Sequence, residues 1–388
     1  MHTKRNEVTA VPLLDVGRQN SPLRAEIDAA IAEVSQSGAF IQGPACREFE
    51  AAVADYCQTA HAIGCASGSD ALLLTLMALG IGPGDEVILP SFTFFATAGS
   101  VWRLGAKPVF ADIVPETFNI DPDDIEQKLT PSTKAIIPVH LFGQCARMRQ
   151  INEIAAAGNI PVIEDAAQAI GARYQSRLAG SLGTAGCFSF YPSKNLGGFG
   201  DGGMITTSDD QLAERLRMLR NHGQHPVYQH DVVGVNSRLD ALQAAVLKVK
   251  LPWVDRWAAE RSQHAERYAA AFASRDLSDT IVVPAVADDC QSVWNQYTVR
   301  VQACRRDALR QFLADRKIGS AIYYPIPLHL QTCFAALRYE TGSLPNTEQA
   351  SQEVLSLPVF PELTPAEQDT VFDAVAEFCR TMPIEHAA

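Results

Sequence analysis

The stretch Ser189-Phe-Tyr-Pro-Ser-Lys-Asn-Leu-Gly-Gly-Phe-Gly-Asp-Gly-Gly203 decides the fold class, because it holds a single lysine, Lys194, in a short turn between two apolar runs. Five glycines and one proline surround this lysine, and Asp201 is the one acid nearby. Glycine backbone leaves room where a side chain would clash, so a lysine on this turn can approach a planar group closely. A solvated lysine on a tight hairpin is the ordinary alternative, and a second motif is needed to decide between them.

The second motif is Pro161-Val-Ile-Glu-Asp-Ala-Ala-Gln168, which predicts a buried strand that ends in Asp165, with Gln168 three residues later. A lysine that forms a Schiff base, together with an aspartate that faces a pyridinium nitrogen, is the pairing that pyridoxal 5'-phosphate (PLP) requires of its protein. We therefore predict a PLP site in which Lys194 carries the cofactor, Asp165 keeps the ring nitrogen protonated and Gln168 donates to the phenolic oxygen. Capping of the next helix by Asp165 and a helix-surface amide at Gln168 are the structural alternatives.

A phosphate cradle is predicted at Ala66-Ser-Gly-Ser-Asp-Ala71, which follows a strand and opens an apolar helix. Free backbone N–H groups and the helix dipole make a helix start of this kind an anion site. We assign Gly68 and Ser69 to the phosphate, and Ser189, five residues before Lys194, can add a hydroxyl. Because any helix can begin with a serine or aspartate cap, this motif has weight only beside the lysine and the aspartate.

The segment Pro90-Ser-Phe-Thr-Phe-Phe95 supplies an aromatic side chain that can lie flat against the cofactor ring. Phe94 is the residue predicted to stack there. Phe92 and Phe95 are the competitors if the register is off by one, and a plain core position is the ordinary role of all three.

Three further residues are candidates for contact with the cofactor or the substrate. In Val235-Asn-Ser-Arg-Leu239, ahead of a long helix, Asn236 is a candidate polar ligand and Arg238 a candidate clamp for a carboxylate or phosphate. The alternative is a helix cap followed by a surface arginine. His329 ends the proline-fixed segment Tyr323-Tyr-Pro-Ile-Pro-Leu-His329, where it can either reach a substrate or hold the loop.

Bulk composition excludes several other classes of protein. The chain has 388 residues, of which 47% are hydrophobic and 20% charged, as is typical of a soluble globular enzyme with two domains. Its formal net charge is −12 and it has no long basic cluster, so no nucleic-acid partner is expected. No apolar run approaches the roughly 18 residues of a membrane span, and polar residues follow the first methionine, so no membrane partner or secretory signal is expected.

The cysteine and histidine patterns predict a cytoplasmic protein without a metal centre. The nine cysteines include no C-x-x-C pair and stand mostly in apolar contexts, as in a chain whose thiols stay reduced. His222, His225 and His230 share one loop, but no acid or cysteine joins them at ligand spacing, so no metal is expected.

The order of apolar runs predicts two domains after an irregular arm at residues 1–20. Residues 21–255 alternate short apolar strands with helix-length segments, which indicates a three-layer α/β/α domain around a mostly parallel sheet. Residues 256–388 have an α+β pattern, with one strand expected at 320–324. An amphipathic stretch at residues 239–273, broken by a proline, is predicted to join the two domains.

Together these motifs resemble those of the DegT/DnrJ/StrS-type nucleotide-sugar aminotransferases, which are fold type I PLP enzymes. The resemblance depends on SFYPSKNLGGFGDGG, EDAAQ, SGSDAL, PSFTFFATA and VNSRLDALQAAVL, and it runs from about residue 12 to the final helix. It implies a large three-layer PLP-binding domain followed by a smaller C-terminal domain. The lysine and EDAAQ motifs are highly specific, and the serine cradle is less so.

The resemblance implies a role for each matching residue. Lys194 matches the Schiff-base lysine, Asp165 the acid at the ring nitrogen and Gln168 the residue at the phenolic oxygen. Asn236 matches a residue that reaches the phosphate from the neighbouring subunit, which implies a homodimer with shared active sites. Some relatives replace the lysine by histidine and dehydrate a sugar, so Lys194 favours amino transfer. The residues that match the phosphate site and the stacking aromatic are Gly68, Ser69, Ser189 and Phe94.

The activity implied by the resemblance is transfer of the amino group of L-glutamate to a nucleotide-linked keto sugar. SFYPSKNLG and YYPIPLHLQ are most similar to members that aminate a 3-keto sugar, either a (deoxy)hexose or a uronate. Relatives that act on 4-keto sugars more often carry histidine where this chain has Tyr191, which we place at the substrate. The alternatives are a 4-keto sugar, a sugar dehydratase and a regulatory homologue of the same fold. The product would enter a surface polysaccharide or an antibiotic sugar.

Overall fold

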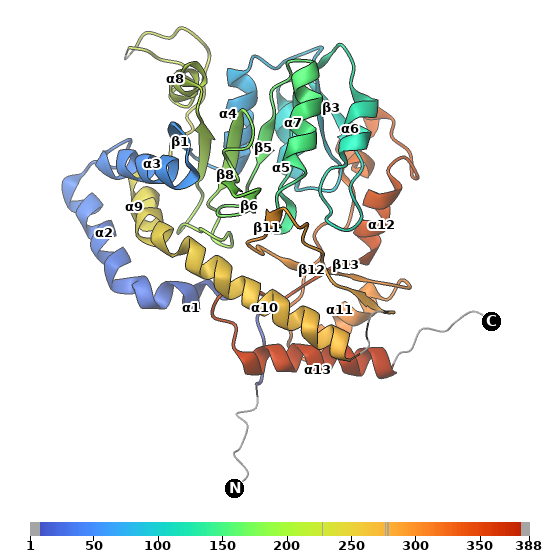
Figure 1. Cartoon of the computed structure of the whole chain (residues 1–388). Helices are drawn as coiled ribbons and strands as arrows, with labels where there is room; N and C mark the ends of the chain where they lie inside the picture. The colour runs from blue at the N-terminus through green and yellow to red at the C-terminus, as the bar shows by residue number, and fades with distance from the viewer. Residues whose placement is uncertain (1–7, 227, 276, 278, 382–388) are drawn as a thin grey trace.

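The computed structural model describes residues 8–226, 228–275, 277 and 279–381. A sheet with helices packed around it occupies the upper part of the molecule as drawn in Figure 1. The C-terminal part lies below this sheet, and one long helix, α10 (Val254–Ser274), runs diagonally along it.

Seven strands of the described chain form the main sheet. They are β1 (His61–Cys65), β2 (Glu86–Pro90), β3 (Lys107–Ala111), β4 (Thr133–Ile136), β5 (Ile163–Asp165), β8 (Ala185–Ser189) and β9 (Gly203–Thr207). Their order across the sheet is β1-β9-β8-β5-β4-β2-β3, and isolated bridges, Ile136 to Val162 and Val139 to Asp165, join the two halves. Among these seven strands, β9 runs in the direction opposite to the other six. The prediction of a mostly parallel sheet is therefore confirmed.

Helices cover both faces of this sheet, because its strands are apolar on both sides. The helices on one face are α3 (Pro44–Cys57), α7 (Met148–Ala157) and α9 (Ala241–Lys250). Those on the other face are α4 (Gly68–Ala78), α5 (Phe95–Arg103) and α8 (Asp210–Leu219). Ile88 belongs to the first cluster and its neighbour Val87 to the second, as the pleat of a strand requires. The predicted α/β/α layering is confirmed.

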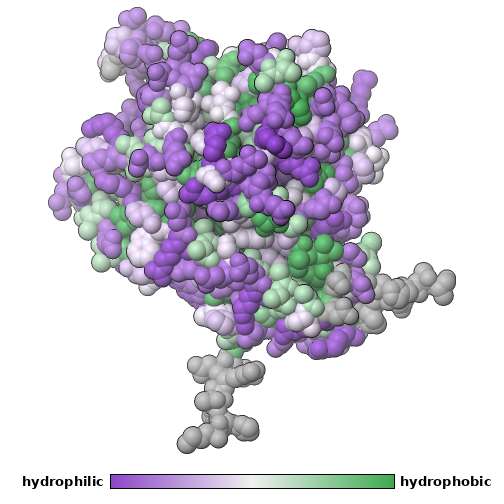
Figure 2. All heavy atoms as spheres, in the orientation of Figure 1, coloured by the Kyte–Doolittle hydropathy of each residue, from purple (hydrophilic) through white to green (hydrophobic). Residues whose placement is uncertain are grey.

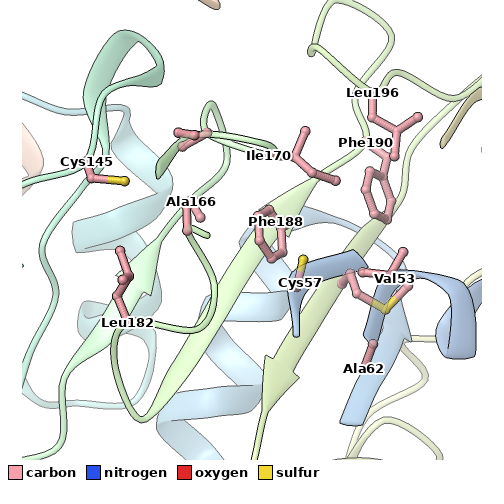
Figure 3. Close-up of a cluster of buried hydrophobic side chains, with 14 of the residues drawn as sticks. Val53, Cys57, Ala62, Cys145, Ala166, Ile170, Leu182, Phe188, Phe190 and Leu196 are labelled. Carbon is pink, nitrogen blue, oxygen red and sulfur yellow. The ribbon is translucent and has the colours of Figure 1, made fainter. Parts of the chain in front are cut away.

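Figure 3 shows part of the first cluster, close to the strand that leads to Lys194. Phe188 lies on β8, and Phe190 and Leu196 lie before and after the lysine; all three are buried. They belong to the same cluster as Val53 of α3. The turn that carries Lys194 is thus anchored in the core on both sides, unlike a solvated hairpin.

Glycine and proline residues set the ends of two helices. The helix α2 (Arg24–Ser37) ends at Gly38, whose φ of 67° is easily adopted by glycine. The amphipathic stretch predicted from the sequence is α9 followed by α10. Between them lies the 3₁₀ turn η3 (Leu251–Trp253), which contains Pro252. A proline removes one backbone donor, so the helix is interrupted there.

The C-terminal part has a hydrophobic core of its own, to which α10 contributes Tyr268 and Phe272. Its small sheet has the strand order β10-β12-β13. The elements of this part are β10 (Ile281–Val282), β12 (Tyr297–Val301), β13 (Val354–Leu357), α11 (Arg306–Asp315), α12 (Pro345–Glu353) and α13 (Pro365–Thr381). The remaining short elements are α1 (Val16–Asn20), α6 (Pro122–Lys128), β6 (Arg173–Tyr174), β7 (Arg177–Leu178), β11 (Cys290–Gln291), η1 (Ser21–Leu23), η2 (Leu141–Gly143), η4 (Leu328–Leu330) and η5 (Thr332–Leu337).

Two local expectations differ from the structure. The N-terminal arm is only partly irregular, because Val11 is buried in the C-terminal core and pairs with Ile318, and α1 follows; residues 1–7 lie outside the described chain. The strand expected at 320–324 is a single bridge from Ala321 to Ser356. The prolines that follow cannot donate to a ladder, and the two tyrosines before them pack beside a separate cluster around Phe92.

Polar side chains cover most of the face shown in Figure 2, with apolar residues in small patches between them. Within the part of the chain that the structure describes, every helix is too short or too polar to cross a membrane.

Candidate active site

Asp165 lies at the C-terminal end of β5 and is 5% exposed. Its Oδ2 accepts a hydrogen bond from the hydroxyl of Thr97 on α5 at 2.8 Å, and its Oδ1 accepts from the N–H of Ala167 at 3.3 Å. Burial raises the pKa of this carboxyl, while Thr97, Ala167 and the charge of Lys194 oppose the rise. A buried carboxylate held by neutral donors is a favourable partner for a cation that contacts it.

Lys194 follows β8 in a tight turn, where its backbone N–H donates to the carbonyl of Tyr191 at 2.8 Å. Its side chain is partly buried. Burial lowers the pKa of this amine to about 8, although the charge of Asp165 acts in the opposite direction. An amine with this pKa exchanges protons near neutral pH, which an ordinary surface lysine does not.

The Lys194 turn is held by neighbouring segments through side-chain amides. Asn195 donates to the carbonyl of Val293 at 2.8 Å and accepts from Asn295 at 2.6 Å. On the other side, Gln243 of α9 accepts from the N–H of Phe199 at 2.7 Å. The turn is therefore fixed in place rather than free to move as a surface hairpin.

Gln168 lies in the turn after β5 and is 7% exposed. Its Oε1 accepts from the N–H of Phe142 at 2.8 Å, which leaves its amide group to donate elsewhere. That group lies 3.5 Å from the hydroxyl of Tyr324. Gln168 thus presents a donor on the side of Tyr324, as a partner for a phenolic oxygen must.

The three aromatic candidates are separated by their surroundings. Phe92 is 1% exposed and packs in the core with Phe118. Phe95 stacks on the buried ring of Phe334, with centroids 5.6 Å apart. Phe94 is 59% exposed, and its ring centroid lies 6.3 Å from that of Tyr324, whose hydroxyl faces Gln168. Phe95 is 47% exposed as well, but of these two exposed rings it is Phe94 that lies beside Tyr324.

The predicted phosphate cradle is the N-terminus of α4. Ser67 caps this helix by accepting from the N–H of Asp70 at 3.1 Å. Gly68 lies so close to Ser189 that an added Cβ would be 2.7 Å from the serine Cβ. Ser69 occupies the first turn, where its carbonyl accepts from Ser100. The structure therefore brings Gly68, Ser69 and Ser189 together, and only glycine allows that approach.

The segment before α9 also touches the cradle. Ser237 is buried, accepts from the N–H of Ala66 at 3.1 Å and donates to Asp70 at 2.8 Å. Asn236, next to it, is exposed. Arg238 donates to the side chain of Asn221 at 3.2 Å, so it is partly engaged within the chain.

Tyr191 and His329 lie in contrasting environments. Tyr191 is 56% exposed beside the Lys194 turn, where a substrate can reach it. His329 is 2% exposed, and its ring nitrogens lie 2.7 Å from the Ser91 hydroxyl and 3.2 Å from a Glu348 carboxylate oxygen. This placement favours the loop-holding role that the sequence left open, and His329 is not brought to the other candidates.

Two residues of the site were missed in the sequence. Thr97 lies in the first turn of α5, three residues after Phe94 at the N-cap of that helix, and Ser237 lies between two residues already selected. Both stand inside motifs that the sequence singled out, so helical spacing was a usable signal for Thr97. A single buried serine gives no comparable signal.

The arrangement fits PLP. The buried Asp165 carboxylate suits a protonated ring nitrogen, the amide of Gln168 suits the phenolic oxygen, and the amine of Lys194 suits the aldehyde. The close approach of Gly68 to Ser189 at a capped helix start suits the phosphate.

Comparisons with known proteins agree with this fit. The model of the DegT/DnrJ/EryC1/StrS aminotransferase family matches residues 22–376. The chain is 52% identical to "Pleiotropic regulatory protein" of Geobacillus stearothermophilus over 95% of this chain and 99% of that one. It is 46% identical to "dTDP-3-amino-3,4,6-trideoxy-alpha-D-glucose transaminase" of Streptomyces venezuelae over 97% and 98%. A crystal structure of S. venezuelae DesV in complex with a ketimine intermediate has a TM-score of 0.92, 46% identity and coverage of 96% and 99%.

Proposed function

The chain belongs to the DegT/DnrJ/EryC1/StrS aminotransferase family, and on that premise we propose that it is a PLP-dependent transaminase that moves the amino group of L-glutamate to C3 of a nucleotide-linked keto sugar. The observation that carries this proposal is the placement of a partly buried amine with a pKa of about 8 beside a buried carboxylate, at Lys194 and Asp165.

PLP, when bound, supplies an aldehyde that condenses with amines and a ring that withdraws electrons from the carbon being deprotonated. Lys194 would hold it through its amine, Asp165 would pair with its ring nitrogen, and Gln168 would donate to its phenolic oxygen. Phe94 would supply an aromatic side chain against the ring. The phosphate is assigned to the N-terminus of α4 and its neighbour, with ligands from Gly68, Ser69 and Ser189.

Lys194 has a second role as the acid and base of amino transfer. Its Nζ takes a proton from Cα of the amino donor in the first half of the exchange, and in the second half it gives a proton to the sugar carbon that receives the amino group. General-base catalysis is most effective when the pKa of the base is near the working pH. The lowered pKa of Lys194, about 8, meets this condition.

The substrate is assigned from the side chains at the mouth of the site. Tyr191 is exposed beside Lys194, and Arg238 can offer its guanidinium to an anionic group of the nucleotide sugar. Amination at C3 is supported by similarity to the S. venezuelae transaminase, whose name places the amino group there. A 3-keto hexose or uronate is the proposed acceptor.

A regulatory role is the second candidate, because one relative with 52% identity is named a regulatory protein. The intact pair of Lys194 and Asp165 favours catalysis, since a protein that only senses a ligand has no need of a tuned amine.

We place the enzyme in the cytoplasm as a homodimer with shared active sites. Five of its nine cysteines are buried and all nine are free, which suits a reducing compartment. Phe40, Ile41, Phe199 and Leu242 are exposed apolar residues around the start of α9, next to the Lys194 turn. A partner that covers them would lie beside the active site, and the exposed Asn236 is the residue proposed to reach the partner's phosphate.

Incubation with L-glutamate and a panel of dTDP- and UDP-linked 3-keto and 4-keto sugars tests the proposal. The panel includes a 3-keto uronate. With a 3-keto acceptor we expect formation of 2-oxoglutarate and an amino sugar, and with 4-keto sugars we expect much slower turnover. Faster turnover of the 4-keto sugars would reassign the carbon that is aminated. No 2-oxoglutarate with any acceptor, from protein that binds PLP, would favour the regulatory role.

A further inference from the structure

A second buried lysine lies behind the Lys194 turn. Lys250, the last residue of α9, is 0% exposed, and its Nζ donates to the carbonyl of Gly197 at 2.5 Å. Gly197 is three residues after Lys194 in the same turn. The mechanism proposed above makes no use of this buried amine.

The surroundings of Lys250 do not explain its burial. Its Nζ lies 5.8 Å from the centre of the Trp257 ring, and its hydrogen-bond acceptor is a backbone carbonyl rather than a carboxylate. Burial lowers its pKa to about 8, and the charge of Glu362 opposes this shift only in part. Burying an ammonium group without a carboxylate as hydrogen-bond partner is unfavourable. The position of Lys250 therefore calls for another explanation.

The carbonyl that Lys250 holds is a critical point of the turn. An added Cβ at Gly197 would lie 2.3 Å from the carbonyl oxygen of Pro192, so the two ends of the turn are in close contact. The N–H of the next residue, Gly198, donates to the carbonyl of Phe190 at 2.8 Å. A donor on Gly197 therefore fixes the closing side of the turn that presents Lys194.

We propose that Lys250 is a positioning residue, whose ammonium group holds the carbonyl of Gly197 and thereby fixes the amine of Lys194 beside Asp165. This inference deepens the proposed function, because the need for positioning follows from the use of Lys194. Without the ammonium group, the Gly197 carbonyl would be buried without a donor, and the turn would shift to hydrate it. More water would then reach Lys194, which is only partly buried in the wild type.

The test compares two lysines of the same helix. Lys250→Met removes the buried donor and keeps the length of the side chain, while Lys248→Met is the matched control, since Lys248 is exposed and pairs with Glu48. Lys250→Arg restores a charged donor and serves as the rescue. Should Lys250→Met fail to fold, Lys250→Leu, which is shorter and carries no donor, replaces it with the same expected result.

Two readouts report on the turn rather than on turnover. The first is the midpoint of the pH titration of the visible absorbance of bound PLP. It should rise by about 0.5 unit or more in Lys250→Met, because hydration favours the protonated nitrogen at Lys194. The second is amide hydrogen exchange of residues 189–203 in the purified protein, which should be about tenfold faster. Lys248→Met and Lys250→Arg should match the wild type in both.

The outcomes separate positioning from simple stability. If Lys250→Met lowers the melting temperature but leaves both readouts equal to those of Lys248→Met, Lys250 is only a structural residue and the inference is wrong. If the wild type gains no visible absorbance with PLP, the proposed function fails, while the exchange measurement still decides whether Lys250 holds the turn.

Discussion

The two faces of the main sheet differ in chemistry from its carboxyl edge, which is the end of the sheet where the parallel strands β5 and β8 stop. This carboxyl edge is called the edge below. The faces are covered by apolar side chains, such as Ile88 on one side and Phe110 on the other, which need no partner beyond close packing. The edge buries a carboxylate at Asp165 and an amine at Lys194, each with a pKa displaced by burial. Stability is thus built on the faces, and reactivity is concentrated where polar groups are buried at a cost.

Removal of the Lys194 amine from the edge should have the largest effect on activity. Lys194→Ala is expected to reduce turnover by at least about 10³-fold and to abolish the visible absorbance of bound PLP, because the group that holds the cofactor and moves the proton is gone. Steady-state kinetics and an absorbance spectrum measure both. Lys248→Ala, at an exposed position, should retain the spectrum and the rate. A Lys194→Ala protein that keeps its spectrum and its rate would contradict the assignment.

A substitution on a face of the sheet should lower stability and leave the cofactor site unchanged. Phe110 on β3 is 0% exposed and contacts Phe334 and Tyr339 edge-on, with centroids 5.6 and 5.5 Å apart. Phe110→Ala leaves a cavity and should lower the free energy of unfolding by about 3–5 kcal/mol. Denaturant titration gives this value. At a temperature where the variant is folded, its PLP spectrum should be unchanged, and a shifted spectrum would show that face and edge are not independent.

The smallest loss of activity is expected from a change at Thr97, an uncharged residue at the edge that donates to Asp165. Thr97→Val removes the hydroxyl that lowers the pKa of Asp165, so that pKa rises further and less of the carboxylate is ionised at a given pH. The acid limb of the kcat/KM profile should move to higher pH, and the rate at neutral pH should fall about tenfold, as for one hydrogen bond to a charged group.

Thr75→Val is the matched control for Thr97→Val. Thr75 is equally buried, but its hydroxyl donates to a helix carbonyl, that of Ala71. Its pH profile should coincide with that of the wild type. If the pH profile of Thr97→Val coincides with those of Thr75→Val and the wild type, the Thr97 hydroxyl does not act on Asp165.

The sequence predicted the sheet and the cofactor because both have local signatures. Apolar runs between helix-length segments indicated the strands, and the spacing of Asp165, Gln168 and the Lys194 turn indicated the cofactor. Phe94 was selected over its neighbours from the register of its segment and from the resemblance, and its exposed ring beside Tyr324 fits that choice.

What the sequence did not predict depends on contacts between distant segments. The segment 320–324 has strand-like composition, yet tertiary packing of its tyrosines and the following prolines reduces it to one bridge. Ser237 and Lys250 act on residues 171 and 53 positions away, respectively. A single sequence has no pattern at such separations.

The most direct test of the account is reduction of the PLP-loaded protein with borohydride, followed by peptide mass spectrometry. We predict one phosphopyridoxyl group, attached to Lys194 in the peptide that contains residues 189–203, and none on Lys250 or on exposed lysines. Protein that remains unlabelled, or that carries the group on another lysine, would contradict the central claim that the buried edge of the sheet is a PLP site.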